Sequence, residues 1–201
     1  NVSMQPEFAD ICGITKEELT EQLGDYVEAF AEAKGITREK MLDELAFRYD
    51  GYHFTWPSPD IFNPFSLLNA LSDKQLGSFW FGSGTPTFLI EMMRKFNVAP
   101  SEIGKSRLPE EEFDAPAERL TSITPLLYQS GYLTIKDYNP LSRLYTLEIP
   151  NNEIRTGLMA NLLPNYVHQY TSSGRTTLGE MCEAIYLDRI DEALQMMRDY
   201  L

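Results

Sequence analysis

Helix-capping signals between residues 15 and 49 constrain the fold of this chain more than any other feature of its sequence. Thr15-Lys-Glu-Glu18 is a capping box, in which the threonine hydroxyl and the glutamate carboxylate each accept a hydrogen bond from an otherwise unpaired amide. An apolar stripe at helical spacing follows and stops at Gly35, a residue typical of helix C-termini; its members are Leu19, Leu23, Tyr26, Val27 and Phe30. Thr37 caps a second apolar-faced stretch that runs to Tyr49. We therefore expect two helices that pack as an antiparallel hairpin.

An aromatic stretch follows directly, reading Arg48-Tyr-Asp-Gly-Tyr-His-Phe-Thr-Trp56. Pro57 and Pro59 exclude a helix there, and Asn63-Pro64 starts the next one, because asparagine caps well and proline loses no hydrogen bond at the first helical position. Phe65, Leu68 and Leu71 are expected to face inward from this third helix.

Later segments alternate between helical and strand patterns. Thr85-Pro86 predicts a helix, residues 98–118 read as a polar surface connection, and Thr124-Pro125 predicts a short helix. Alternation around Leu133–Ile135 and Tyr145–Ile149 predicts a β-hairpin. Pro150-Asn151 caps another helix, and Thr177-Leu-Gly-Glu180 is a second capping box that opens a final helical pair.

The sequence thus predicts a mainly α (α+β) protein, a helical bundle with a small antiparallel β-hairpin. We expect a helical lid-like region at 1–118, a winged-helix-like unit with the hairpin at 119–166, and a helical pair at 167–201. Many small α+β units share the order helix, hairpin, helix.

Charge and composition narrow the classes of partner. Thirty acidic and seventeen basic residues give a net charge of -13, a field that disfavours binding to nucleic acid and to anionic membranes. No apolar run reaches the roughly 18 residues that span a bilayer, and Cys12 and Cys182 alone build no disulfide framework. A cytoplasmic location is expected. A chain that starts at Asn1 and stops within a helical pattern at Leu201 is expected to be a piece of a longer protein.

No catalytic or metal-binding constellation stands out. Gly104-Lys105-Ser106 matches only the tail of a phosphate-binding loop and is interpreted as a plain loop. His53 and His168 lack a recognisable nucleophile beside them, and His53 among aromatic neighbours is interpreted as a packed, hydrogen-bonded ring. Histidines and cysteines do not cluster, so the sequence predicts neither a catalytic residue nor a metal site.

Four stretches carry a family resemblance. They are Cys12-Gly-Ile-Thr-Lys-Glu-Glu-Leu19, Tyr49-Asp-Gly-Tyr-His-Phe54 with Asn63-Pro-Phe-Ser66, Phe79-Trp-Phe-Gly-Ser-Gly-Thr-Pro-Thr-Phe88, and Pro125-Leu-Leu-Tyr-Gln-Ser-Gly-Tyr-Leu-Thr134 continuing to Pro150-Asn151. In order and spacing they resemble the bacterial AAA-ATPase-like family, whose members combine a P-loop ATPase core with, often, a restriction-endonuclease-like nuclease domain.

The resemblance implies that this chain is the middle region of such a protein, without its P-loop core or its nuclease domain. ATP and magnesium are implied only for the parent protein, and no cofactor is expected in this chain. The upstream core and the downstream domain of the same polypeptide are the implied partners. The expected function is a noncatalytic regulatory module that relays nucleotide state.

Under this interpretation the aromatic stretch is a structural brace or an interface. The candidates are Asp50, Gly51, Tyr52, His53, Phe54, Trp56 and Asn63. Arg48 is the one residue there that could sense a nucleotide phosphate, although a surface or salt-bridging arginine is the simpler interpretation. Two other functions stay open, a nucleic-acid-binding winged-helix module and a carbohydrate-binding module that uses Tyr52 and Trp56.

Overall fold

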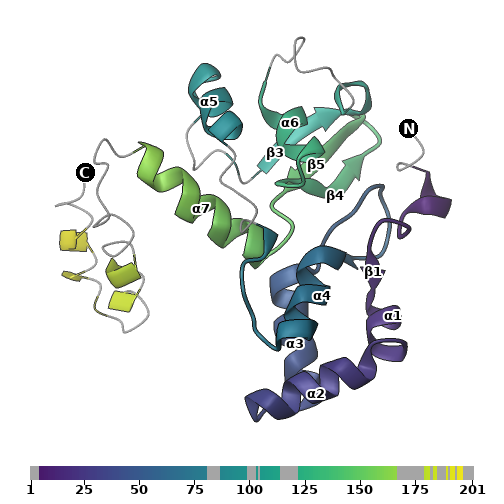
Figure 1. Ribbon diagram of the computed structural model, residues 1–201. Coiled ribbons are helices and arrows are strands. Elements are labelled where there is room, and N and C mark those ends of the chain that lie inside the picture. The colour runs from purple at the N-terminus through teal and green to yellow at the C-terminus, as the bar shows by residue number, and fades with distance from the viewer. Residues whose placement is uncertain are drawn as a thin grey trace. The chain divides into compact units, whose positions relative to one another are not determined.

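The computed structural model describes residues 5–80, 87–98, 103, 105–113 and 122–166, together with short pieces between 179 and 196. The chain divides into two compact units, 1–157 and 158–201. Helices predominate, and two small antiparallel sheets accompany them, as the predicted mainly α (α+β) class requires (Figure 1).

Four helices build the N-terminal part of the first unit: α1 (Lys16–Glu21), α2 (Gly24–Lys34), α3 (Arg38–Tyr49) and α4 (Pro64–Asp73). The capping box at Thr15 is present, with Thr15 accepting from the Glu18 amide at 3.1 Å and Glu18 accepting from the Thr15 amide at 2.9 Å. Gly35 ends α2 in the left-handed conformation, at φ +66°. These start and stop signals agree with the sequence-based prediction.

The apolar stripe predicts one continuous helix, but the structure has two, α1 and α2. The chain breaks between α1 and α2 at Gln22 and Leu23, and Leu23 serves as the N-cap of α2 without a side-chain hydrogen bond. Tyr26, a member of the expected stripe, is 59% exposed. The stripe predicts a single helical face, but the break between α1 and α2 turns Tyr26 away from the core that Leu19 and Phe30 share.

The core of this helical part is formed by side chains from all four helices and from the strand that precedes α4. Its fully buried members include Leu19, Val27, Phe30, Met41, Leu45, Tyr49, Phe62 and Leu67. Phe65 and Leu68 were predicted to face inward, but they are 55% and 47% exposed. Leu67 and Ala70 take their place, because the contacts of α4 with α2 and α3 select the neighbouring face of that helix.

Two short strands, one before α1 and one before α4, pair with each other. β1 (Ile14–Thr15) pairs antiparallel with β2 (Ile61–Phe62), with Ile14 opposite Phe62. A single bridge between Tyr52 and Ile61 adds to this pairing. The residues between Asp50 and Asp60 therefore form a closed loop whose two ends lie next to each other.

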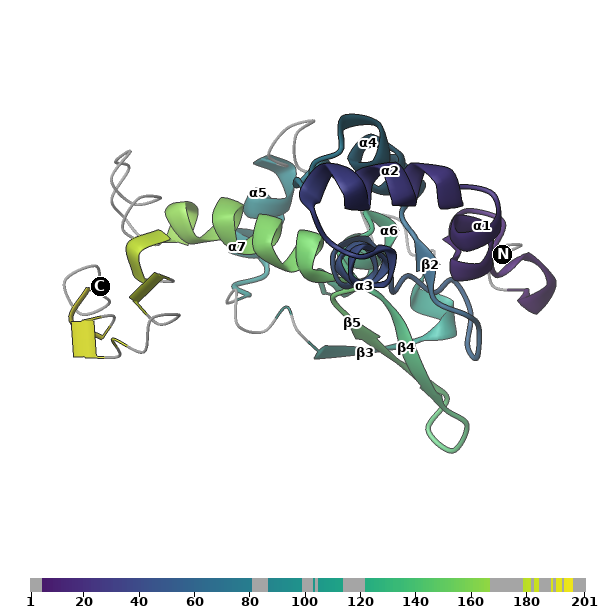
Figure 2. The same ribbon diagram turned by 90° about the horizontal axis from the view of Figure 1, so that it is seen from below.

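A three-stranded antiparallel sheet follows, with the order β3-β5-β4. It comprises β3 (Lys105–Pro109), β4 (Thr134–Asn139) and β5 (Leu144–Glu148). The hairpin β4–β5 was predicted, and its loop extends away from the sheet in Figure 2. β3 is not predicted by the sequence, which indicates a surface connection at 98–118 and a plain loop at Lys105-Ser106. Both predictions are wrong for residues 105–109, because Leu108, which is 2% exposed, places β3 in the core beside β5.

Helices α5 (Thr87–Lys95), α6 (Thr124–Gln129) and α7 (Asn152–Tyr166) complete the order of elements, with short 3-10 turns at Pro6–Phe8 and Glu110–Glu112. Asn151 caps α7 by accepting from the Ile154 amide at 3.1 Å, as its position after Pro150 predicts. The expected capping box at Thr177–Glu180 falls mostly outside the described residues. Within the parts of the chain that the structure describes, no helix is long and apolar enough to cross a membrane.

Candidate functional site

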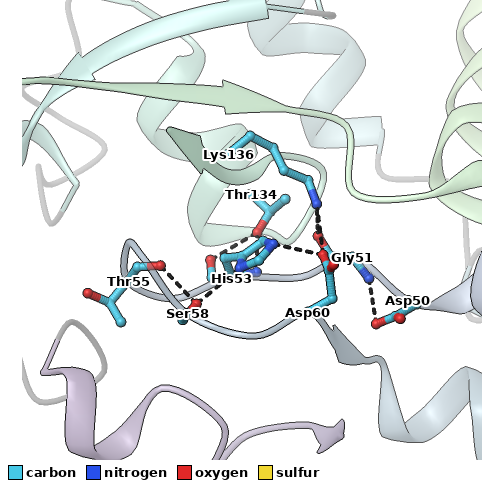
Figure 3. A network of polar contacts seen from close by, with 8 residues as sticks. All are labelled: Asp50, Gly51, His53, Thr55, Ser58, Asp60, Thr134 and Lys136. Atoms are coloured by element: carbon cyan, nitrogen blue, oxygen red, sulfur yellow. Dashed lines mark hydrogen bonds and ion pairs between the residues drawn. The ribbon is translucent and has the colours of Figure 1, made fainter. Parts of the chain in front are cut away.

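The loop from Asp50 to Asp60 carries a network of polar contacts (Figure 3). Helix α3 ends at Asp50, whose Oδ1 accepts a hydrogen bond from the Gly51 amide at 2.8 Å. Asn63 closes the other end of the loop. Its backbone amide donates to the Tyr49 carbonyl at 3.0 Å, and its side-chain Oδ1 accepts from the Ser66 backbone amide at 3.2 Å, which caps α4. The loop is therefore held by helix caps on both sides.

Gly51 occupies a position that only glycine fits. Its φ is +101°, and a Cβ placed there would lie 2.5 Å from the carbonyl oxygen of Pro150. The backbone of the loop thus passes very close to the residue that precedes the α7 cap. Any side chain at position 51 would have to push these two backbone segments apart.

Two hydrogen bonds tie the loop to strand β4. The His53 amide donates to Thr134 Oγ1 at 2.7 Å, and the Thr134 hydroxyl donates back to the His53 carbonyl at 2.9 Å. Both residues are buried, His53 at 5% and Thr134 at 1% exposure. One threonine side chain therefore satisfies both backbone groups of a buried loop residue, as a neighbouring strand would.

Lys136, two residues further along β4, fastens the same loop. Its ammonium group donates to the Gly51 carbonyl at 2.6 Å and lies 3.2 Å from Asp60 Oδ1. Tyr52 adds a third connection, because its hydroxyl donates to the Gly131 carbonyl at 3.2 Å. We call the loop 50–60, together with Thr134 and Lys136, the brace.

The His53 ring lies between Ser58 and Asp60. Its Nδ1 is 3.0 Å from Ser58 Oγ, and its Nε2 is 2.8 Å from Asp60 Oδ1. Trp56 packs edge-on against the ring, with centroids 5.1 Å apart. The expectation of a packed, hydrogen-bonded ring is thus confirmed, but the serine and carboxylate partners were not predicted.

A serine, a histidine and an aspartate in this order have the connectivity of a hydrolase triad. Three features oppose that chemistry here. The Ser58 hydroxyl is also placed to donate to the Thr55 carbonyl, at 3.0 Å. Asp60 Oδ1 also contacts the Lys136 ammonium group. The pKa of His53 is lowered, mainly by burial and secondly by the Lys136 charge, and this makes the imidazole a weaker base.

The third feature is the missing backbone donor for an oxyanion. Ser58 stands between Pro57 and Pro59, so neither neighbouring residue has an amide N–H. The amide that follows a nucleophile commonly stabilises the tetrahedral intermediate, and proline cannot supply it. The arrangement is therefore suited to holding the loop in one conformation rather than to acyl transfer.

Asp50 is a largely buried carboxyl group of the brace, and its pKa is raised. Burial, with a further contribution from the neighbouring Asp60 charge, raises its pKa to about 6, although the Gly51 amide opposes this shift. Arg48 is half-buried and forms an ion pair with Glu44, one turn earlier in α3, with Arg48 Nε 3.7 Å from Glu44 Oε2. This is the salt-bridging role that the sequence left open for Arg48.

The remaining candidates separate into two groups. Trp56 packs on the His53 ring inside the brace, whereas Tyr52, Phe54 and Asn63 line a cavity. Ser58, Asp60, Thr134 and Lys136 are the brace residues that sequence reasoning missed. Within the described residues, no group of three or more histidine, cysteine or acidic side chains could hold a metal ion.

Comparison with known proteins places the chain beside one distant relative. No family model matches it, and no solved structure does. It is 29% identical over 182 residues to an uncharacterized protein from Azotobacter chroococcum mcd 1, which is described by its position in the vnfD 5' region. The alignment covers 88% of this chain and 32% of the relative, so the chain spans about a third of that protein's length.

Proposed function

We propose that this chain is a noncatalytic, helical and winged-helix-like regulatory module of an AAA-ATPase-like protein, and that it couples an upstream nucleotide-binding core to a downstream effector domain. The observation that carries the proposal is the reciprocal pair of hydrogen bonds between His53 and Thr134. These residues are 81 positions apart. They join the helices before the loop to the sheet after it through buried contacts.

A relay needs such a connection, because motion passes between elements only where they are packed or hydrogen-bonded to each other. The brace offers several connections at once: Thr134 and Lys136 hold the loop to β4, and Gly51 is pressed against the Pro150 carbonyl at the start of α7. A displacement of α3 would thus be passed to both β4 and α7.

The order of elements supports the winged-helix-like part of the proposal. Within the unit expected at 119–166, a helix (α6), a hairpin (β4–β5) and a helix (α7) follow one another, and β3, from the residues before this unit, adds to the hairpin at β5. A three-stranded sheet with a protruding hairpin loop is the framework that winged-helix units share. The likeness concerns architecture, and architecture alone does not specify a ligand.

Binding to nucleic acid has less support than coupling. Lys136 is one of four cations that the sequence offers between 119 and 166 for phosphate contacts, and its ammonium group is engaged by Gly51 and Asp60. The net charge of -13 adds a long-range repulsion. Binding to carbohydrate through Tyr52 and Trp56 also has less support, because the Trp56 ring packs on His53 instead of forming a platform with Tyr52.

Nucleotide binding tests the proposal directly. We expect the 201-residue chain to bind no ATP in calorimetry with magnesium present, and the same chain extended upstream in its parent protein to bind it. In the longer protein, ATP should change the hydrogen exchange of β4 and β5 amides, and Thr134→Val should reduce that change. ATP binding by the 201-residue chain alone, or its absence from the longer protein, would contradict the proposal. We place the protein in the cytoplasm, where ATP is available.

A further inference from the structure

A cavity of about 440 Å³ lies beside the brace. Its walls come from separate segments of the first unit: Cys12, residues 52–54 and 61–64, Trp80, residues 128–131, and residues 133 and 134. A hollow enclosed by several segments is concave, and its volume falls within the range of roughly 300–1,000 Å³ that is usual for small-molecule sites. The proposed coupling role does not account for it.

Several aromatic residues line the cavity. They are Tyr52, Phe54, Phe62, Trp80 and Tyr128. Such rings bind flat apolar groups through stacking and edge-to-face contacts. The lining therefore favours a ligand that contains a ring system.

The same walls contain no aspartate, glutamate, lysine or arginine among the described lining residues. Burying an ion there would leave its charge without a partner, which is costly. A charged ligand is consequently disfavoured, and the excess of negative charge on the chain adds to the penalty for an anion.

Several polar groups of the lining are already engaged within the protein. Thr134 is occupied by both backbone groups of His53, the Asn63 Oδ1 accepts from Ser66, and the Tyr52 hydroxyl donates to Gly131. A sugar, whose many hydroxyls need partners, would lose more hydrogen bonds with water than it could regain here. A mainly apolar ligand loses few.

We propose that this cavity is a binding site for a neutral, predominantly apolar small molecule that contains an aromatic ring system. Because its walls include residues 52–54 of the loop and Thr134 of β4, an occupied cavity stabilises the same contacts that hold the loop to β4. The site is independent of nucleotide binding, so either proposal can fail without the other.

The test uses 1-naphthol, which is neutral at pH 7, and 1-naphthoate, its anionic counterpart of similar size. We expect saturable binding of 1-naphthol in calorimetry with a Kd below about 0.5 mM, as suits a ligand of this size. We expect 1-naphthoate to bind at least about tenfold more weakly, because its charge has no partner. Equal binding of the two compounds, or no saturable binding of 1-naphthol, would overturn the proposal.

Two variants locate the binding. Ser130 lines the cavity, so Ser130→Trp should fill it and abolish binding, whereas Leu141→Trp, at a position that is 95% exposed on the hairpin loop, should leave binding unchanged. If Ser130→Trp does not fold by circular dichroism, Phe54→Leu replaces it and should weaken binding about fivefold through loss of one ring. Unaltered binding in the cavity variant that folds would place the ligand elsewhere and refute the assignment.

The reactivity of Cys12 gives a second, local measure of ligand binding in the cavity. It is exposed and lies at the cavity, so iodoacetamide can reach its thiol. Peptide mass spectrometry measures the rate of Cys12 alkylation. Saturating 1-naphthol should slow this reaction about threefold or more. In Ser130→Trp, the ligand should have no effect on the rate. An alkylation rate at Cys12 that 1-naphthol does not change would count against occupancy of this cavity.

Discussion

The Thr134 hydroxyl hydrogen-bonds both backbone groups of His53: it accepts from the His53 amide at 2.7 Å and donates to the His53 carbonyl at 2.9 Å. Neither group reaches solvent, since His53 is 5% exposed and Thr134 is 1% exposed. One side-chain oxygen of β4 therefore satisfies both backbone groups of His53, and Lys136 adds a separate connection between β4 and the loop.

Thr134→Val removes that oxygen while keeping the shape of the side chain. Two buried backbone groups of His53 then lose their partner, and we expect the free energy of unfolding to fall by about 2–4 kcal/mol. Urea denaturation followed by circular dichroism measures the loss. Thr134→Ser keeps the hydroxyl and is the matched control; a loss as large as that of Thr134→Val would show that packing of the methyl group, not the pair of hydrogen bonds, holds the loop.

Gly51→Ala tests the close approach of the loop to Pro150. The new Cβ would meet the Pro150 carbonyl oxygen at 2.5 Å, and the φ of +101° adds backbone strain. We expect a loss of about 3 kcal/mol or more in the free energy of unfolding. Gly35→Ala is the control for strain alone, because φ is +66° there and nothing lies within 4 Å; it should cost only about 1 kcal/mol. Equal losses would mean that the contact with Pro150 has no energetic weight.

Asp50→Asn tests the buried carboxyl group. The folded protein raises the pKa of Asp50 from 3.8 to about 6, mainly through burial, so folding favours the protonated form. Between these two pKa values the folded state binds more protons than the unfolded state, and stability falls as pH rises toward 6. Asparagine can still accept from the Gly51 amide but carries no charge.

We therefore expect Asp50→Asn to be more stable than the natural chain at pH 8, by about 1 kcal/mol after allowance for solvent screening, and equally stable near pH 4. Thermal unfolding at the two pH values makes the comparison. A variant that is less stable at pH 8 would show that the ionised carboxylate is favoured in the fold.

Lys136→Met tests the electrostatic part of the brace. The Lys136 charge is the second cause, after burial, of the lowered pKa of His53. Its removal should raise the His53 pKa toward 6.5, as measured by NMR titration of the ring protons. Loss of the hydrogen bonds to Gly51 and Asp60 should also reduce the free energy of unfolding by about 1–2 kcal/mol. A His53 pKa that falls or does not move would contradict the assigned contact.

Ser58 provides the test of the structural interpretation of its contact with His53. We expect no covalent labelling of Ser58 by a fluorophosphonate, because its hydroxyl is placed to donate to Thr55 and no neighbouring amide can stabilise an oxyanion. Ser58→Ala should instead cost about 1 kcal/mol of stability. Labelling that disappears in Ser58→Ala, detected by intact mass, would identify a nucleophile and reverse our interpretation.

Local signals in the sequence were sufficient for most helix boundaries and for the hairpin. The capping residues Thr15, Thr37, Asn63 and Asn151 and the terminating Gly35 act on backbone groups within four or five positions, so their effect can be read without the rest of the fold. Alternation of apolar residues in Tyr145–Ile149 likewise predicted a strand, because its period of two is a local property.

Only the tertiary structure decided which residues meet across long distances in the chain. β3 carries little apolar alternation and exists because β5 offers it an edge, and α4 buries Leu67 and Ala70 instead of Phe65 and Leu68 because of where α2 and α3 lie. Thr134 and Lys136 look like ordinary strand residues, and nothing within ten positions of them indicates His53 or Gly51. Hydrogen bonds between segments about 80 positions apart depend on the whole path of the chain, and that path is fixed by packing rather than by local propensity.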